Sequence, residues 1–137
     1  VGSGENVVDL TCVQNVIEAI MCCINAPENA FGEAYNITNG EPVKLWNVLN
    51  GLLTDLGFAP PTKKVPKKLA LLAAGFVEWK TKLFSPQKEP ALTKYGIGIL
   101  ADNFTLDISK ARKNLNYKPI QSTEDGIKEF VDWYCSQ

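Results

Sequence analysis

Residues 32–57 read GEAYNITNGEPVKLWNVLNGLLTDLG, and this stretch decides the fold class. Apolar and polar residues alternate over residues 33–38, between Gly32 and Asn39-Gly40, which predicts a short strand. From residue 42 to residue 56 the apolar residues recur at helical spacing. Pro42 near the start and Gly57 just past the end are both favourable helix signals. A strand followed at once by a helix indicates part of an α/β layer.

The other periodic segments predict a helix-rich chain with short strands. Residues 92–100 fit a helix or a strand, and their periodicity does not separate the two. Asp107 is expected to cap one helix, and Ser122 with Asp125 has the form of a capping box at the start of the last. The expected helices span residues 13–24, 42–56, 66–84, 107–115 and 122–133, and the expected strands or extended segments span 7–9, 33–38, 60–65 and 104–106. Residues 85–90 are expected to break the chain.

Composition fits one globular domain of 137 residues and excludes several classes of function. The net charge is −1, from 14 basic and 15 acidic residues without long like-charge blocks, so nucleic acid is not an expected partner. The chain contains no histidine, which removes Ser-His-Asp triads and the commonest zinc ligand. Its one arginine is Arg112, so bidentate binding of a phosphate by several arginines is not expected.

The four cysteines are Cys12, Cys22, Cys23 and Cys135, and none forms a C-x-x-C pair. Cys22 and Cys23 lie in an apolar stretch, where free cysteines are typical small core residues, so a reducing, cytoplasmic location is expected. No initiator methionine or signal-type segment precedes Val1. We therefore expect a fragment of a longer protein.

The opening Gly2-Ser3-Gly4 suggests a phosphate-binding loop but lacks the rest of that motif. Val7 replaces the third glycine of G-x-G-x-x-G, and no strand precedes the loop, so a plain turn is expected. No tyrosine is followed four residues later by a lysine, the pair that exchanges protons in short-chain dehydrogenases. The chain is thus expected to hold no catalytic, cofactor-binding or metal-binding residues of its own.

The longest apolar run covers residues 69–77 and is flanked by Lys67, Lys68, Lys80 and Lys82. It is too short to span a bilayer, which needs about 20 residues. Attachment to a membrane surface and a core or pocket-covering helix both fit this pattern, and the second is favoured. Trp46, Trp79 and Trp133 are likewise expected in the core or at an interface. An alternative function is a standalone lipid- or protein-binding module that uses the apolar helix near residues 66–84.

Several stretches resemble, in order and spacing, the C-terminal part of extended short-chain dehydrogenases. They are GSGENVVDLTCVQNVIEAI, GEAYNITNGEPVKLWNVLNGLLTDLG, FTLDISKARKNLNYKP and STEDGIKEFVDWY. The resemblance is to the 3β-hydroxysteroid dehydrogenase and NAD-dependent epimerase/dehydratase group and covers nearly the whole chain. It implies an α/β, helix-rich substrate-binding domain over residues 1–137. The Rossmann domain with the NAD or NADP site and the Tyr-x-x-x-Lys pair would lie upstream.

The same resemblance implies which segments line the substrate pocket, namely those near residues 4–8 and 90–100. The candidate substrate-binding residues are Gly4, Asn6, Val7, Val8, Leu92, Lys94 and Tyr95. Exposure of surfaces that normally pack on the missing domain would favour self-association, with a homodimer as one form.

One departure from the family pattern bears on the substrate. Nucleotide-sugar epimerases of this group usually carry an arginine where this chain has Val8, and another shortly before the equivalent of Asp107, which is also absent here. Loss of both would leave a diphosphate poorly held. A hydrophobic ketone or secondary alcohol fits better: a sterol-like ring system, a dihydroflavonol, or a 2-alkyl-3-oxo acid whose carboxylate could meet Lys94.

Overall fold

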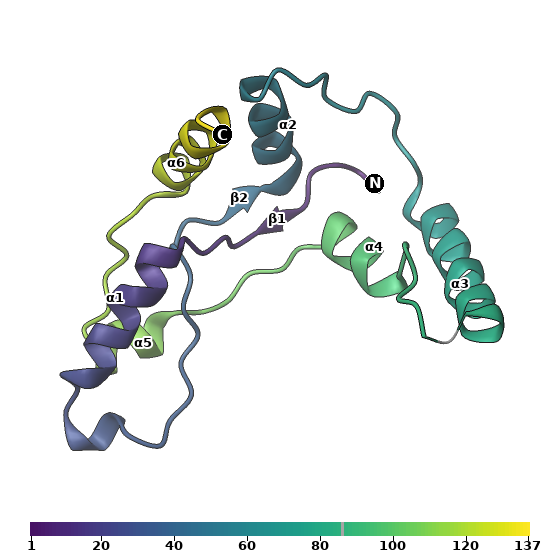
Figure 1. Cartoon of the computed structure of the whole chain (residues 1–137). Coiled ribbons are helices and arrows are strands. Elements are labelled where there is room, and N and C mark those ends of the chain that lie inside the picture. The colour runs from purple at the N-terminus through teal and green to yellow at the C-terminus, as the bar shows by residue number, and fades with distance from the viewer. Residues whose placement is uncertain (86) are drawn as a thin grey trace.

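The computed structural model describes residues 1–85 and 87–137, so the expected break at residues 85–90 lies partly outside the described residues. The chain forms an arch (Figure 1), with α1 and α5 at one end, α3 and α4 at the other, and the strands, α2 and α6 between them. In chain order the elements are β1 (Val7–Val8), α1 (Val13–Ile24), η1 (Glu28–Ala30), β2 (Val43–Lys44), α2 (Leu45–Asp55), α3 (Lys67–Phe84), α4 (Lys94–Ala101), α5 (Ser109–Asn114) and α6 (Thr123–Cys135).

The sheet is small and differs from the expected one. β1 and β2 pair antiparallel, with Val7 opposite Lys44 and Val8 opposite Val43. The helix expected from Pro42 therefore begins only at Leu45, because the two preceding residues are used for strand pairing. Of the strand expected at residues 104–106, one parallel bridge remains, between Phe104 and Val8.

The strand expected at residues 33–38 does not form, although the segment carries no helix either. Two of its carbonyl oxygens accept hydrogen bonds from side chains. The Tyr117 hydroxyl donates to the Thr38 carbonyl at 2.9 Å, and the Thr11 hydroxyl donates to the Ile37 carbonyl at 3.3 Å. A strand requires a neighbouring strand for its backbone groups. The described part of the chain gives this segment none.

The helices follow the sequence patterns more closely. α1 has the expected bounds, α3 begins directly after Pro66, and α4 shows that the ambiguous segment is helical. Ser122 Oγ accepts the Asp125 N–H at 3.1 Å as a helix cap, and α6 extends to Cys135. Asp107 instead accepts the Ser109 N–H at 2.8 Å, one step ahead of the helix that it was expected to cap.

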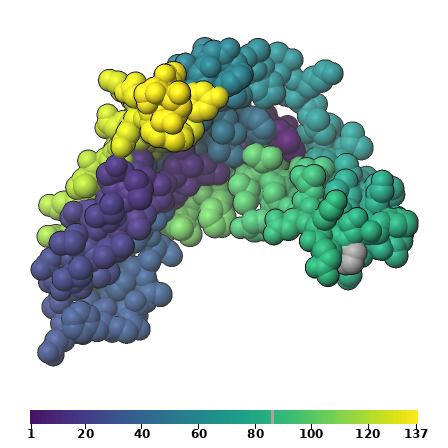
Figure 2. Space-filling model, viewed as in Figure 1, coloured from purple at the N-terminus to yellow at the C-terminus, as the bar shows by residue number. Residues whose placement is uncertain are grey.

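Most of the buried apolar side chains among the described residues form two separate clusters, and Val8 and Leu45 lie outside both. The larger joins α1, η1 and α5 and contains Ala19, Ala30, Ile108, Ala111, Leu115 and Tyr117. The smaller lies between α3 and α4 and contains Ala70, Ala74 and Ile97, with Leu71, Leu92 and Val1 packed against it. In the space-filling view the two ends of the arch flank an open underside (Figure 2).

Cys23 was expected in the core, and Trp79 and Trp133 were expected in the core or at an interface; all three are exposed, and the interface role of the two tryptophans stays a prediction. Cys23 is exposed, whereas Cys22 is partly buried against the larger cluster, and all four cysteines are free thiols. Trp79 and Trp133 keep more than half of their surface in solvent, so neither is a core residue of this chain. Trp79 lies on α3, whose buried residues are Ala70 and Ala74, and Trp133 lies near the C-terminal end of α6, where the neighbouring residues are exposed.

Candidate functional site

An apolar cavity of about 350 Å³ lies where β1, the start of α2 and α4 meet. Its walls are Val8, Asp9, Leu10, Leu45, Tyr95, Gly98, Ile99, Asp102, Asn103 and Phe104. Most of the lining surface is carbon, which is typical of sites for small apolar ligands. The cavity is therefore our candidate binding site.

One wall is fixed by backbone hydrogen bonds around β1. The Phe104 N–H donates to the Val7 carbonyl at 2.8 Å, and the Asp9 N–H donates to the Phe104 carbonyl at 3.0 Å. The Asp9 carboxylate also accepts the Leu106 N–H at 2.7 Å. These bonds hold residues 103–106 alongside β1 and place the Phe104 ring at the cavity.

The opposite wall is α4, and two side chains hold its C-terminal end through three hydrogen bonds. Asn6 Nδ2 donates to the carbonyls of Ile99 and Asp102 at 3.4 and 3.3 Å. Trp46 Nε1 donates to the Leu100 carbonyl at 2.9 Å. The last carbonyls of a helix have no hydrogen-bond partner within it, so Asn6 and Trp46 donate to carbonyls that would otherwise lack one.

An ion pair joins the same end of α4 to the start of α3. Lys67 Nζ lies 2.5 and 2.7 Å from the two carboxylate oxygens of Asp102. The Val7 N–H donates to Asn103 Oδ1 at 2.8 Å on the other side of the turn. The width of the cavity is thus set by contacts from β1, α2 and α3 together.

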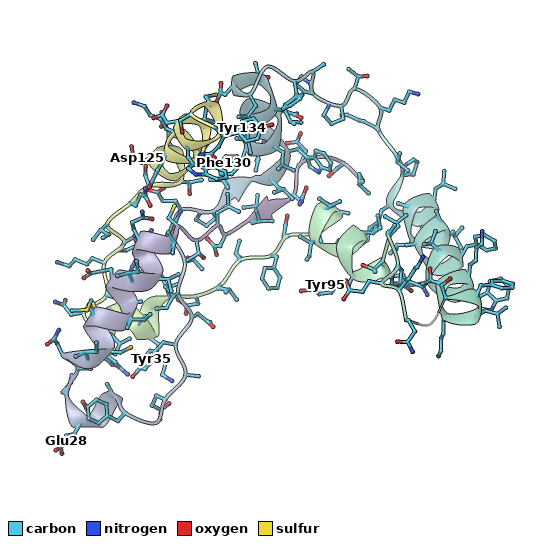
Figure 3. All side chains as sticks on the ribbon, viewed as in Figure 1. Glu28, Tyr35, Tyr95, Asp125, Phe130 and Tyr134 are labelled. Atoms are coloured by element: carbon cyan, nitrogen blue, oxygen red, sulfur yellow. The ribbon has the colours of Figure 1, made fainter. Side chains whose placement is uncertain are left out.

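The structure brings two of the predicted site residues together at the cavity: Val8, which is buried, and Tyr95, which is 78% exposed. Tyr95 projects from α4 at the underside of the arch (Figure 3). Asn6 is buried behind the wall and acts on α4 through the bonds described above. Val7 pairs with Lys44 in the sheet.

The other predicted site residues lie elsewhere. Gly4 sits at φ +79°, with open space where a Cβ would lie. Leu92 packs against the cluster between α3 and α4. The Lys94 N–H donates to Glu78 at 2.8 Å, and the lysine side chain lies over Gly75 of α3. Lys94 is therefore turned toward α3 in this structure.

Sequence reasoning missed Leu45 and Phe104 as cavity residues and did not single out Gly98 and Ile99 within their segment. The alternation at residues 104–106 was a usable signal, since it marked an extended segment able to lie beside β1. Nothing local in the sequence marks Leu45, which meets the cavity because α2 starts directly after β2.

The chemistry that this site can perform is binding and orientation. The polar groups of Asp9, Asp102 and Asn103 already have hydrogen-bond partners. Burial raises the pKa of Tyr117 and of Cys22, but both belong to or pack against the larger cluster, away from the cavity. Within residues 1–85 and 87–137 there is no cluster of three or more His, Cys, Asp or Glu side chains that could hold a metal ion.

No family model matches the chain. It is similar to 3beta-hydroxysteroid-dehydrogenase/decarboxylase isoform 1 of Arabidopsis thaliana, at 38% identity over 141 residues, covering 96% of this chain and 32% of that protein. It is also similar to 2-alkyl-3-oxoalkanoate reductase of Shewanella oneidensis, at 32% identity over 133 residues, covering 93% of this chain and 34% of that protein.

Among solved structures the chain is similar to UDP-glucuronic acid 4-epimerase from Bacillus cereus in complex with NAD. The TM-score is 0.61 at 18% identity, covering 98% of this chain and 33% of that one. These relationships confirm the resemblance to the C-terminal part of extended short-chain dehydrogenases and the helix-rich α/β fold class. The chain spans about a third of the length of the relatives that it matches.

Proposed function

We propose that residues 1–137 form a single substrate-binding domain of an NAD(P)-dependent oxidoreductase that acts on a hydrophobic ketone or secondary alcohol. The observation that carries this proposal is the apolar cavity, which unites Val8 and Tyr95 from the two segments that were expected to bind substrate. A Rossmann domain of the same protein would supply the NAD or NADP site and the proton-transfer pair. The bound nicotinamide would supply hydride chemistry.

The residues of this chain would bind and orient the substrate. Val8, Leu45 and Phe104 provide apolar walls that exclude water, and holding the reacting carbon in place lowers the entropic part of the barrier. Val8 in place of arginine offers no charged fork for a diphosphate. A sterol-like ring system, a dihydroflavonol or a 2-alkyl-3-oxo acid suits these walls better than a nucleotide sugar.

Binding is tested by filling the cavity from one side. Gly98 lies on the cavity wall, and a Cβ there would meet only an Asp102 oxygen at 3.9 Å, so the Gly98→Leu side chain would enter the cavity without a backbone clash. We expect the affinity for dehydroergosterol, a fluorescent sterol, to fall about tenfold or more, a loss of ~1.4 kcal/mol. The measurement is energy transfer from tryptophan to the sterol.

Gly51→Leu is the matched control. Gly51 is also a helical glycine with open space at its Cβ position, but it lies in α2 away from the cavity. Unchanged affinity in Gly51→Leu with loss in Gly98→Leu supports the proposal. Equal affinity in both variants, or no sterol binding by the unaltered chain, argues against a sterol-like substrate at this cavity.

Catalysis is tested separately. We expect the 137-residue chain alone to oxidise or reduce no alcohol or ketone with NAD or NADP, followed by nicotinamide absorbance. Turnover by the purified chain would overturn the assignment of the chemistry to another domain. A coding sequence upstream of Val1 with G-x-x-G-x-x-G and Y-x-x-x-K motifs would support the oxidoreductase over a standalone binding module.

A further inference from the structure

A second cavity, of about 500 Å³, lies between the start of α1, α2 and α6. Its apolar walls are formed by Leu10, Val13, Leu52, Ile127, Phe130 and Trp133. The candidate binding site shares Leu10 with it, and the other described residues that line the two cavities differ. The second cavity is therefore a separate place for a ligand.

Gly126 allows α6 to lie close to the start of α1. A Cβ at this position would collide with Cys12 Sγ, so a larger residue would push the two helices apart. Glu129 follows Gly126 by three residues, which places it on the same side of α6, where it meets Gln14 of α1. The close approach of the two helices thus brings a carboxylate to the cavity.

Two amide side chains fix the position of this carboxylate. Gln121 Nε2 donates to Glu129 Oε2 at 2.7 Å, and Gln14 Nε2 lies 3.2 and 3.4 Å from Oε1 and Oε2. Amides are neutral, so these bonds hold the carboxylate in place without cancelling its charge. Glu129 is the one charged side chain among the described residues that line the cavity, and none of the ion pairs of the described chain includes it.

The carboxylates of the candidate binding site are in a different situation. Asp102 forms an ion pair with Lys67, and Asp9 accepts the Leu106 N–H. A neutral apolar ligand that covered Glu129 would remove water from a charge and put no opposite charge in its place, which is costly. Charge therefore disfavours a neutral ligand at the second cavity and favours a cation.

Aromatic rings beside Glu129 point to an organic cation. Phe130 and Trp133 follow it on α6, with 5.8 Å between their ring centroids and an angle of 42° between their planes. Phe130 is 43% and Trp133 56% exposed, so both rings keep surface that a ligand can contact. The face of an aromatic ring attracts ammonium groups, most strongly for tryptophan.

Helix α3 also exposes large apolar side chains, but without an unpaired carboxylate beside them. Leu72, Phe76 and Leu83 keep more than half of their surface in solvent and line neither cavity. The acidic residue of α3, Glu78, accepts the Lys94 N–H. None of the helices in the described part of the chain is long and apolar enough to cross a membrane. The expected core position is wrong for these side chains, and a pocket-covering role for α3 stays a prediction.

We propose that the second cavity binds an organic ammonium ion with a compact apolar body. The ammonium group meets the Glu129 carboxylate and the aromatic faces of Phe130 and Trp133, and the apolar body lies against Leu52 and Ile127. The positive charge replaces the water that the carboxylate loses. This site does not depend on the function proposed for the candidate binding site.

Three adamantane derivatives test the role of charge, because they share one rigid apolar cage. They are 1-adamantanamine, which is protonated at neutral pH, the neutral 1-adamantanol, and the anion adamantane-1-carboxylate. Isothermal titration calorimetry measures their affinities for the chain. We expect the amine to bind about five times as tightly as the alcohol or better, and the carboxylate to bind most weakly. The preference for the amine should shrink as salt is raised.

Two substitutions locate the binding. Glu129→Gln removes the charge but keeps an oxygen that accepts from Gln121. The affinity for the amine should therefore fall about threefold or more, while the affinity for the alcohol stays unchanged and shows that the variant is folded. Trp133→Leu should weaken binding of both compounds, since the Trp133 ring lines the cavity.

The controls make the same changes outside the cavity. Glu124→Gln alters a carboxylate of α6 that does not line it, and Trp79→Leu alters an exposed tryptophan of α3. Both should bind the amine as the unaltered chain does. Gly98→Leu should also leave amine binding unchanged, and Glu129→Gln should leave sterol binding unchanged, so the two cavities are tested separately.

Three results would overturn the proposal. The first is binding of the alcohol as tightly as the amine, or no binding of either. The second is an equal loss of amine affinity in Glu124→Gln and Glu129→Gln. The third is oligomers in light scattering that Glu129→Gln disrupts, because a basic side chain of a second copy would then be the occupant.

Discussion

The two ends of the arch are held together by different forces. At one end, buried amide side chains join α1 to the segment around the start of α6, whereas at the other end the buried contact between α3 and α4 consists of Ala70, Ala74 and Ile97, and the Lys67–Asp102 ion pair lies at its exposed edge. Hydrogen bonds require particular distances and directions, but alanine contacts tolerate sliding. The first end is therefore expected to have one defined arrangement, and the second to be the more easily displaced.

Asn39 is the centre of the first arrangement. Its Oδ1 accepts from the Cys12 N–H at 2.8 Å and from Asn15 Nδ2 at 2.7 Å, and its Nδ2 donates to Thr123 Oγ1 at 3.0 Å. Asn15 Oδ1 in turn accepts the N–H groups of residues 120 and 121 at 2.8 and 3.0 Å. Two buried amides thus connect three stretches that are far apart in the sequence: residues 12–15, residue 39 and residues 120–123.

The largest expected effect is that of Asn39→Leu. The substitution keeps a similar volume but leaves the Cys12 N–H and one of the two N–H groups of Asn15 Nδ2 without partners, each costing ~1–3 kcal/mol, while the other Asn15 N–H still donates to the Gln121 carbonyl. We expect the free energy of unfolding to fall by ~3 kcal/mol or more, measured by urea denaturation. Asn36→Leu is the control, because Asn36 is exposed and makes a single bond, to the Asp107 carbonyl. Similar losses in both variants would contradict the central role of Asn39.

The next effect concerns the alanine contact. Ala74 is fully buried between α3 and α4, so Ala74→Leu should overpack that contact at a cost of ~1–3 kcal/mol. Ala73 is exposed on the same helix, and Ala73→Leu should be nearly neutral. We expect amide hydrogen exchange to rise in α3 and α4 of the Ala74 variant and to stay unchanged in α1 and α6. A rise throughout the chain would show that the two ends unfold as one unit.

A smaller effect is expected at the joint between the two ends. Trp46→Phe keeps a ring but removes the Nε1–H donor to the Leu100 carbonyl, a loss of ~1 kcal/mol. We expect faster hydrogen exchange at the C-terminal end of α4 and weaker sterol binding, because this bond fixes one wall of the cavity. Trp133→Phe should change neither the exchange rates nor the sterol affinity read from the fluorescence of the sterol excited directly, since Trp133 is exposed on α6.

Local sequence patterns predicted most of the helices correctly and the strands less well. The bounds of α1 and the Ser122 cap of α6 follow from residues within a few positions of one another. The expected strand at residues 33–38 failed because pairing depends on a neighbour that local alternation cannot supply. The predicted start of α2 was wrong because Val43 and Lys44 pair with β1, about 36 residues away in the sequence.

The sequence predicted only some residues of the candidate site, because most of its contacts join residues that are far apart in the chain. Val8 and Tyr95 line the apolar cavity, and their role in substrate binding, which was expected from family resemblance, stays a prediction. Asn6 was expected to line the pocket and instead holds α4 from behind, through contacts with residues 99 and 102. Contacts across more than 90 positions leave no periodic signal in one sequence. The tight packing that produces them is a property of the folded chain.

The smallest expected effect is electrostatic and lies at the amide-held end. Lys110 Nζ donates to Glu33 at 2.8 Å and to the Ala34 carbonyl at 2.9 Å, and it lies 4.9 Å from the centre of the Tyr35 ring. The hydrogen bond and charge of Lys110 hold the pKa of Glu33 below its usual range. Both partners are about half exposed, so solvent screens the pair and its contribution to stability is small.

The sign of the pH dependence follows from the lowered pKa. The ion pair stabilises the fold above the unfolded-state pKa of Glu33, and that stabilisation is lost as the pH falls through the lower folded-state pKa. Lys110→Gln should raise the pKa of Glu33 toward its ordinary value, followed by NMR titration, and should leave Glu5 unchanged. Glu5 is a matched carboxylate whose pKa is lowered by Lys44 in the sheet. A shift of both carboxylates would mean that Lys110 acts through a wider rearrangement, and the amide-held end would then be less rigid than its buried hydrogen bonds imply.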